Sequence, residues 1–197
     1  MPALRPLHVA INARAMCFSP HGSGKYVERI TEILAAEGVR VTLLAPSSLD
    51  QHYDIPQGMQ VIVHPSRSLL AWEEQLLPPL LNTHKPDIYF AATGRGIPRV
   101  RRKHTLYILG MLDVIPWRFP FLTFGEPPRF WTLRHEAFPQ LISWARAHHI
   151  WTISRPSRKD ILAFTPSKSV TGIPYPMTGT PIAPCTNPRQ QFVYVGG

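Results

Sequence analysis

Apolar runs and amphipathic segments alternate along most of the chain. The uninterrupted run at residues 7–12 (LHVAIN) predicts a buried strand, because a strand covered on both faces carries apolar side chains at successive positions. A loop with two glycines follows, then an amphipathic segment at residues 25–38, and then a second apolar run at residues 40–45 (RVTLLA). This order predicts a β-α-β unit whose two strands run parallel.

The amphipathic segment has the spacing of a surface helix. Its apolar side chains recur every three or four residues, at Val27, Ile30 and Leu34. Glu28 lies between these positions, so we expect it to face solvent. Gly38 is suited to end the helix, because glycine adopts the left-handed conformation without steric cost.

The same alternation continues to residue 174. Five further apolar runs predict strands, at residues 59–64, 87–91, 104–110, 150–154 and 169–174. Three amphipathic segments predict helices, which prolines interrupt in the first two cases, at residues 68–84, 129–148 and 156–164. Strands that alternate with helices are typical of an open sheet covered on both faces. We therefore expect an α/β, Rossmann-like three-layer α/β/α fold with a mostly parallel sheet of about seven strands.

The pattern changes after residue 174. Residues 175–191 are rich in proline and small side chains, which predicts a linker. Residues 192–197 (FVYVGG) read as a strand followed by the glycines of a tight turn, which is how an α/β domain begins. The sequence thus predicts one domain at residues 1–174, a linker, and the first strand of a second domain.

The positive charge of the chain is concentrated in one region. Residues 95–160 hold twelve Lys and Arg against four Asp and Glu, which accounts for +8 of the net charge of +9. Charge placed in this way indicates an anionic partner, such as a substrate phosphate, an anionic membrane or nucleic acid. No recognisable nucleic-acid motif accompanies it, and this disfavours nucleic acid as the partner.

The remaining composition favours a cytoplasmic setting. The two cysteines, Cys17 and Cys185, lie far apart and form no metal-binding pattern, so the simplest interpretation is a reduced compartment with no metal and no cofactor. No export signal is apparent at the N-terminus, and no apolar stretch has the length of a membrane span.

Candidate binding residues follow the first strand, at the edge where open parallel sheets bind ligands. Gly22, Ser23 and Gly24 lie in the segment SPHGSGKY (residues 19–26). The segment is no Walker phosphate loop, because Ser19 replaces the first glycine and a tyrosine follows the lysine. Two interpretations stay open: the glycines let the backbone approach an anion, or they serve only to turn the chain.

Two further groups of candidates follow later strands. A basic stretch follows the fourth strand and is either a solvated face or a contact for anionic lipid or substrate phosphate, with Trp117 as a nearby aromatic; its cations are Arg95, Arg99, Arg101, Arg102 and Lys103. Asp113 follows the fifth strand, where it either binds a sugar hydroxyl or a proton, or caps a helix or forms a salt bridge.

The order of these segments resembles the N-terminal half of a family-four (group 1) glycosyltransferase with the GT-B fold. The likeness spans almost the whole chain and is carried by the segments GSGKYVERITEILAAEGVRVTLLAP, WEEQLLPPLLNTHKPDIYFA, LDVIPWRFP, IWTISRPSRKDIL and QFVYVGG. The sequence departs from the family in one notable place, because Leu112 stands where the family has a histidine before the aspartate.

The resemblance implies a bacterial type of enzyme that transfers a sugar from a nucleotide-sugar donor to a saccharide or lipid-linked acceptor, as in polysaccharide biosynthesis. It implies that Gly22, Ser23 and Gly24 approach the donor diphosphate, and that Asp113 and the loop after it lie on the acceptor side of the cleft. From its charge, we expect the basic stretch to face the acceptor or the inner face of the membrane. Catalysis in this family occurs between two domains. We therefore expect residues 1–197 alone to bind nucleotide sugar weakly and to transfer nothing, since positioning in a closed cleft supplies roughly 7–11 kcal/mol.

Two other classes of protein remain open. One is a basic nucleic-acid-binding module, and steeply salt-dependent binding to generic DNA would favour it. The other is a phosphate-binding α/β protein that is complete in itself.

Overall fold

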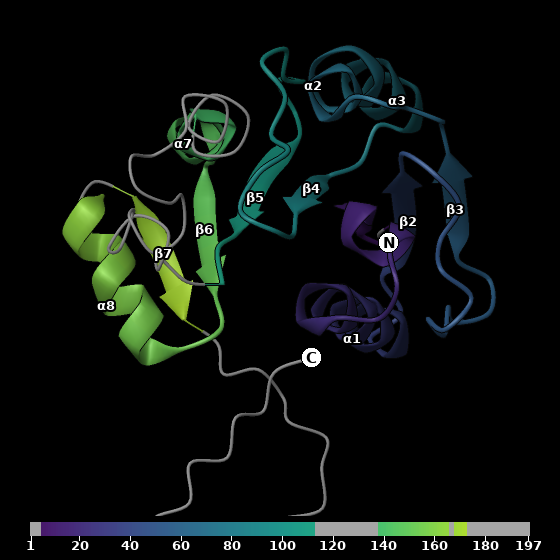
Figure 1. Cartoon of the computed structure of the whole chain (residues 1–197), viewed down its shortest axis with the longest axis horizontal. Helices are drawn as coiled ribbons and strands as arrows, with labels where there is room; N and C mark the ends of the chain where they lie inside the picture. The colour runs from purple at the N-terminus through teal and green to yellow at the C-terminus, as the bar shows by residue number, and fades with distance from the viewer. Residues whose placement is uncertain (1–4, 113–137, 166–167, 173–197) are drawn as a thin grey trace, which may run out of the picture.

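The structure is a computed structural model that describes residues 5–112, 138–165 and 168–172. These residues form a single sheet of seven parallel strands (Figure 1). The strands are β1 (His8–Asn12), β2 (Arg40–Ala45), β3 (Gln60–Val63), β4 (Ile88–Ala91), β5 (Leu106–Gly110), β6 (His149–Thr152) and β7 (Ser169–Gly172). The predicted α/β, Rossmann-like fold is confirmed, and the strands lie within the predicted apolar runs or within a residue of them.

The sheet has the strand order β3-β2-β1-β4-β5-β6-β7. β1 lies between β2 and β4, so that Ala10 pairs with Thr42 on one side and with Tyr89 on the other. All five residues of β1 are buried. The chain builds the sheet in one direction from β1 to β3 and in the opposite direction from β4 to β7. The order therefore reverses between β1 and β4, which is where open α/β sheets leave a crevice for ligands.

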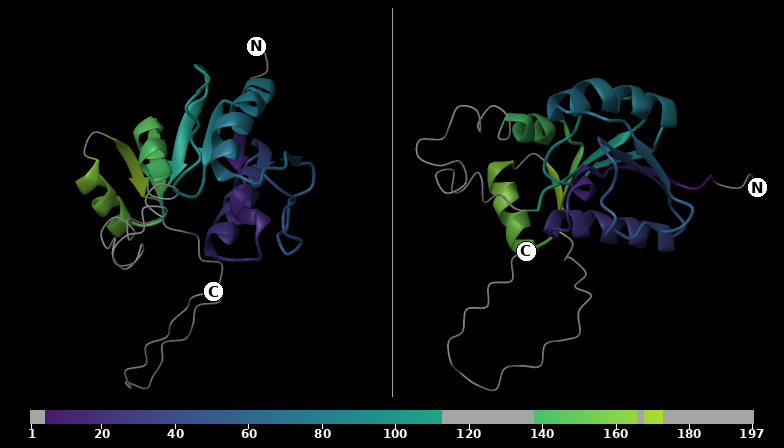
Figure 2. Two further views of the ribbon diagram at one scale, coloured as in Figure 1. Left: turned by 45° about the horizontal axis from the view of Figure 1, so that its top comes forward. Right: turned by 45° about the vertical axis from the view of Figure 1, so that its right-hand side comes forward.

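Helices cover both faces of the sheet (Figures 1 and 2). Helix α1 (Gly22–Ala36) packs on one face, where Val27 meets Ile11, Leu43 and Phe90 in one apolar cluster. The second face is covered by α2 (Leu69–Ala71), the turn η2 (Trp72–Leu76), α3 (Leu77–His84) and α7 (Phe138–Arg146). Helix α8 (Arg155–Phe164) joins this second cluster through Ile161. The two clusters are the two cores of a three-layer fold.

The helical segment before β4 contains a π-helical turn directly before two prolines. Across η2 the amide of Leu77 bonds to the carbonyl of Trp72, five residues earlier. A proline lacks the amide proton and its ring collides with the carbonyl four residues earlier, so a wider turn relieves the clash from Pro78 and Pro79. The predicted interruption is confirmed. The turn buries Trp72 and Glu73, and Glu73 reaches the candidate site from there.

One prediction about a side chain is wrong, and one predicted helix is only partly described. Glu28 does not face solvent: it is buried, it pairs with Lys25, and it accepts a hydrogen bond of 2.7 Å from the amide of Asp54. The predicted helix at residues 129–148 is helical at residues 138–146, while its first nine residues lie outside the described part of the chain. Also outside that part are the linker at residues 175–191 and the strand at residues 192–197.

Candidate functional site

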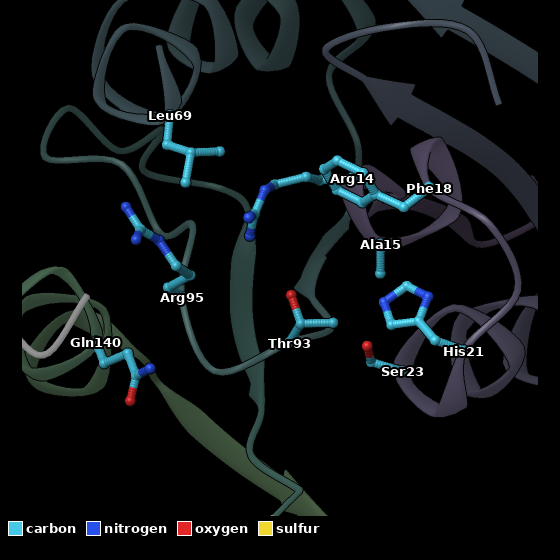
Figure 3. Close-up of a pocket in the computed structure, with 9 residues that line it drawn as sticks. All are labelled: Arg14, Ala15, Phe18, His21, Ser23, Leu69, Thr93, Arg95 and Gln140. Atoms are coloured by element: carbon cyan, nitrogen blue, oxygen red, sulfur yellow. The ribbon is translucent and has the colours of Figure 1, made fainter. Parts of the chain in front are cut away.

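A cavity of about 270 Å³ lies where the strand order reverses, beyond the carboxyl ends of β1 and β4 (Figure 3). Its walls come from the turn after β1, the start of α1, the segment after β4, and helices α2 and α7. The described residues that line it are Arg14, Ala15, Phe18, His21, Ser23, Leu69, Thr93, Arg95 and Gln140. The cavity thus lies at the edge of the sheet that the β-α-β pattern marks as the ligand edge.

The wall after β1 is a 3-10 turn, η1 (Arg14–Cys17), which the sequence reasoning missed. The amide of Ala13 bonds to the carbonyl of Leu44 at 2.9 Å, and the amide of Arg14 bonds to Oδ1 of Asn12 at 3.3 Å. Asn12 is buried, and its Oδ1 also accepts a hydrogen bond from the indole of Trp72. Asn12, the last residue of β1, therefore connects η1 to the helix layer through Trp72. Its hydrogen bond to the amide of Arg14 fixes the backbone from which the Arg14 side chain extends.

The start of α1 forms the second wall. Gly22, Ser23 and Gly24 are the first three residues of the helix rather than part of a loop, which corrects the predicted boundary. No acidic residue lies in this first turn, and the residue before the helix, His21, makes no side-chain cap. Backbone amides at such an end carry partial positive charge and favour an anion. Ser23 lines the cavity, so this end of the helix borders it.

The two glycines of this turn have different surroundings. A β-carbon on Gly22 would meet open space. A β-carbon on Gly24 would lie 1.9 Å from the hydroxyl oxygen of Tyr53 and 3.0 Å from the carbonyl of Ala15. Glycine at position 24 is therefore required by packing, and only position 22 leaves room for a ligand to approach.

Tyr53 is fixed over the start of α1 by several contacts. Its hydroxyl lies 3.4 Å from Nδ1 of His21, and the ammonium of Lys25 lies 5.3 Å from the centre of its ring. Partial burial raises the pKa of the Tyr53 phenol. The buried Glu28 ties the same loop to the helix through the amide of Asp54. The loop and the first turns of α1 therefore act as one packed unit beside the cavity.

The segment after β4 forms the third wall and carries Arg95. Gly96 has a φ of +106°, and a β-carbon there would lie 2.5 Å from Nδ2 of Asn12, so only glycine fits. Its amide donates to Oγ of Ser143 at 3.0 Å, and its carbonyl accepts from the hydroxyl of Tyr89 at 2.8 Å. Full burial raises the pKa of Tyr89 well above its usual range, so this phenol stays a donor.

Arg95 forms a buried ion pair at this wall. Its Nε and Nη2 atoms donate to the two carboxylate oxygens of Glu73 at 2.7 and 2.9 Å. Arg95 is 7% exposed and Glu73 is 4% exposed. This two-pronged geometry holds the guanidinium in one orientation, and the carboxylate balances its charge.

The structure separates the residues of the predicted basic stretch. Arg95 is buried, whereas Arg99, Arg101 and Lys103 are exposed and Arg102 is half-buried. Arg101 donates to the carbonyl of Arg146 and lies 6.0 Å from the ring centre of Tyr107. These five cations therefore do not share one solvated face. Of the remaining predicted site residues, Asp113 and Trp117 lie outside the described part of the chain.

Sequence reasoning found Ser23 and Arg95 among the cavity residues and missed the others. Arg14 and Thr93 follow the carboxyl ends of β1 and β4 by two residues, so the strand ends themselves were the signal that could have found them. The candidate segment predicted after the first strand begins at Ser19, and Arg14 lies before it.

The described residues contain neither a metal-binding cluster nor a membrane-spanning helix. Nowhere in these residues do three or more His, Cys, Asp or Glu side chains come together in a way that could hold a metal ion. Their helices are also too short or too polar to cross a bilayer. Comparison of the sequence with known protein families and with curated proteins finds no matching family model and no matching protein.

Proposed function

We propose that this chain is the N-terminal, acceptor-side domain of a group 1 glycosyltransferase with the GT-B fold. It takes part in the transfer of a sugar from a nucleotide-sugar donor to a saccharide or lipid-linked acceptor. The observation that carries the proposal is the cavity at the reversal of strand order, bordered by the first turn of α1. It lies at the same segment that carries part of the sequence resemblance.

The chemistry of the cavity supports a phosphate-bearing ligand. Arginine, serine, threonine and glutamine side chains line it, together with the amide end of α1, and these groups donate hydrogen bonds to phosphate oxygens. Of the nine described residues that line the cavity, none is Asp or Glu. A nucleotide sugar presents its diphosphate to such a wall while its base and sugar extend beyond it.

In this proposal, the three residues predicted to contact the donor diphosphate have different roles at the start of α1. Ser23 borders the cavity and approaches the diphosphate, and Gly22 leaves room for it. Gly24 supports both by allowing Tyr53 to pack on the helix. Asp113 and Trp117 keep the acceptor-side roles that the resemblance implies. The exposed cations Arg99 and Lys103 remain candidates for contact with an anionic membrane.

A second candidate function is a phosphate-binding α/β protein that acts without a further domain. It is favoured by one observation: described residues from both sides of the strand-order reversal line the same cavity. The two candidates differ in what they recognise, because a nucleotide-sugar site selects a base and a sugar, while a phosphate site does not.

Calorimetric titration of the 197-residue chain with UDP-glucose, GDP-mannose, ADP-glucose and pyrophosphate tests this difference. We expect one nucleotide sugar to bind weakly but saturably, and more tightly than the other two and than pyrophosphate. Equal affinity for all four compounds would overturn the glycosyltransferase proposal in favour of the phosphate-binding protein. Absence of binding by every nucleotide sugar would overturn the donor role of the cavity.

A further inference from the structure

We infer that Arg14, the first residue of η1, is the side chain of this cavity that binds a phosphate group of the ligand, and that Arg95 on the opposite wall is a structural residue. The inference rests on the proposed function in that it takes the ligand to bear phosphate. It differs from the sequence expectation, which placed the anion-binding cations in the stretch from residue 95 to residue 103.

Arg14 is placed to reach the ligand. It follows the carboxyl end of β1 by two residues and lines the cavity. In Figure 3 its side chain extends from η1 into the middle of the labelled group, and its guanidinium lies between Leu69, Thr93 and Arg95 in that view. Arg95 instead turns its guanidinium away from this centre, in the direction in which its partner Glu73 holds it.

The backbone that carries Arg14 is rigidly fixed. The amide of Arg14 bonds to Oδ1 of the buried Asn12, and the amide of Met16 closes the turn on the carbonyl of Ala13 at 2.9 Å. Asn12 cannot shift freely, because Trp72 donates to the same oxygen at 3.3 Å. A side chain on a fixed backbone loses less freedom when it binds, which favours affinity.

The buried ion pair with Glu73 makes Arg95 a poor ligand for a phosphate group. The Glu73 carboxylate neutralises Arg95 through two short bonds inside the protein. A phosphate that approached Arg95 would have to compete with this buried carboxylate, and the two anions would repel each other. Arg14 comes from the opposite wall, and its guanidinium lies in the middle of the labelled residues that line the cavity (Figure 3).

Phe18 supports the same assignment. Its ring centre lies 5.8 Å from Cζ of Arg14, within the range of a cation–π contact. The planar guanidinium stacks well on aromatic rings, and its edge carries the N–H groups that bind phosphate with two parallel bonds. Phe18 itself lines the cavity, so this contact holds the guanidinium beside the space that a ligand would occupy.

Other groups at the cavity complete the coordination of a phosphate. Ser23 and Thr93 supply hydroxyl groups, and the first turn of α1 supplies backbone amides. A phosphate bound by Arg14 would have these donors for its remaining oxygens. The inferred site therefore combines one guanidinium with several neutral hydrogen-bond donors.

The test uses pyrophosphate as the probe and compares three variants of the 197-residue chain by calorimetric titration at low ionic strength. Arg14→Gln should weaken binding roughly tenfold or more, because hydrogen bonds to a charged group contribute about 1.5–3 kcal/mol. Arg14→Lys should fall between this variant and the unmodified chain, since it keeps the charge and loses the planar fork. Arg40→Gln is the matched control: it removes the same charge from an exposed position at the amino end of β2, at the edge of the sheet opposite the cavity, and should leave the dissociation constant within about twofold.

Each result decides the inference. Equal weakening by Arg14→Gln and Arg40→Gln would overturn it, and so would failure of the unmodified chain to bind pyrophosphate. If Arg14→Gln does not fold, as judged by circular dichroism, an unchanged affinity of Arg14→Lys overturns it and a reduced affinity supports it. The inference and the proposed function can be told apart. If pyrophosphate binding depends on Arg14 but no nucleotide sugar is preferred, the phosphate site is supported and the glycosyltransferase proposal is contradicted.

Discussion

The segments that follow β1 and β4 reach the same cavity and place their arginines in different environments. After β1, a short 3-10 turn fixed by Asn12 presents the half-buried Arg14. After β4, Gly96 in an unusual backbone conformation and the carboxylate of Glu73 enclose Arg95. The second segment holds most of the basic residues, whereas the first holds the arginine that enters the cavity. The number of charges in a segment therefore says little about how many of them are available to a ligand.

The largest effect is expected at the buried ion pair of the second segment. Glu73→Ala leaves Arg95 buried without its carboxylate, and removing one partner of such a pair costs about 3–5 kcal/mol of unfolding free energy. Arg14→Gln, at the half-buried position of the first segment, removes the cation–π contact with Phe18 and should cost less, about 1 kcal/mol. Urea denaturation of both variants measures the contrast. Similar losses for the two would show that the arginines are equally structural, and the comparison would fail.

The next effect is expected within the first turn of α1. Gly24→Val forces a side chain against Tyr53 and the carbonyl of Ala15, and overpacking of this kind costs about 1–3 kcal/mol. Gly22→Ala is the control, because a β-carbon there meets open space; it should leave stability nearly unchanged. Thermal unfolding compares the two variants, and truncation of the neighbouring ring by Tyr53→Ala should make Gly24→Val less harmful than it is alone. An equally stable Gly24→Val variant would mean that Tyr53 does not pack as the structure shows.

The same pair of glycines separates packing from binding. Loss of nucleotide-sugar affinity in Gly24→Val would follow from displacement of α1 and Tyr53, so it would say nothing about contact with a diphosphate. Gly22→Ala lacks this ambiguity, since its added methyl group disturbs no neighbour. A test of backbone approach to the ligand therefore belongs at position 22.

Periodicity predicted the layers of this fold well, because burial imposes a repeat on the sequence. β2 begins and ends where its apolar run predicts, and the prolines at 78 and 79 interrupt the helix as expected. Glu28 was misassigned because a periodic pattern cannot reveal that a distant loop will supply the amide of Asp54 as a partner. The periodicity of apolar positions therefore cannot predict a buried polar residue whose hydrogen-bond partner is distant in the sequence.

The site was harder to predict than the fold for the same reason. Arg95 looked like one cation in a basic run, and its burial depends on Glu73, which lies 22 residues earlier on a π-helical turn. Arg14 carried no motif at all, and its role follows from strand order and from a turn fixed by Asn12. The rule that open parallel sheets bind ligands beyond the carboxyl ends of their strands predicted the edge at which the cavity lies. It did not predict which side chains line the cavity, because their placement depends on contacts between residues distant in the sequence.

The smallest expected effect concerns the exposed part of the second segment, where the structure places Arg101 next to His148. Partial burial lowers the pKa of His148, and the positive charges of Arg101 and Lys168 lower it further. The ring also accepts a hydrogen bond of 2.9 Å from the amide of Tyr107 at Nδ1, which requires that atom to be unprotonated. Replacing Arg101 with glutamine removes one of the repelling charges, so the pKa of His148 should rise towards its ordinary value.

Titration of the histidine resonances by NMR measures this change, and His149 is the matched control. The pKa of His149 is also lowered, but by burial alone, so Arg101→Gln should leave it unchanged. Because the folded-state pKa of His148 lies below its unfolded value of 6.5, the unfolded chain binds more protons as the pH falls through the interval between these two values. Stability is therefore fully present above that interval and is lost below it, and the variant should lose less of it on acidification. If Arg101→Gln moves neither the pKa of His148 nor the acid side of the stability curve, Arg101 does not stay beside this ring.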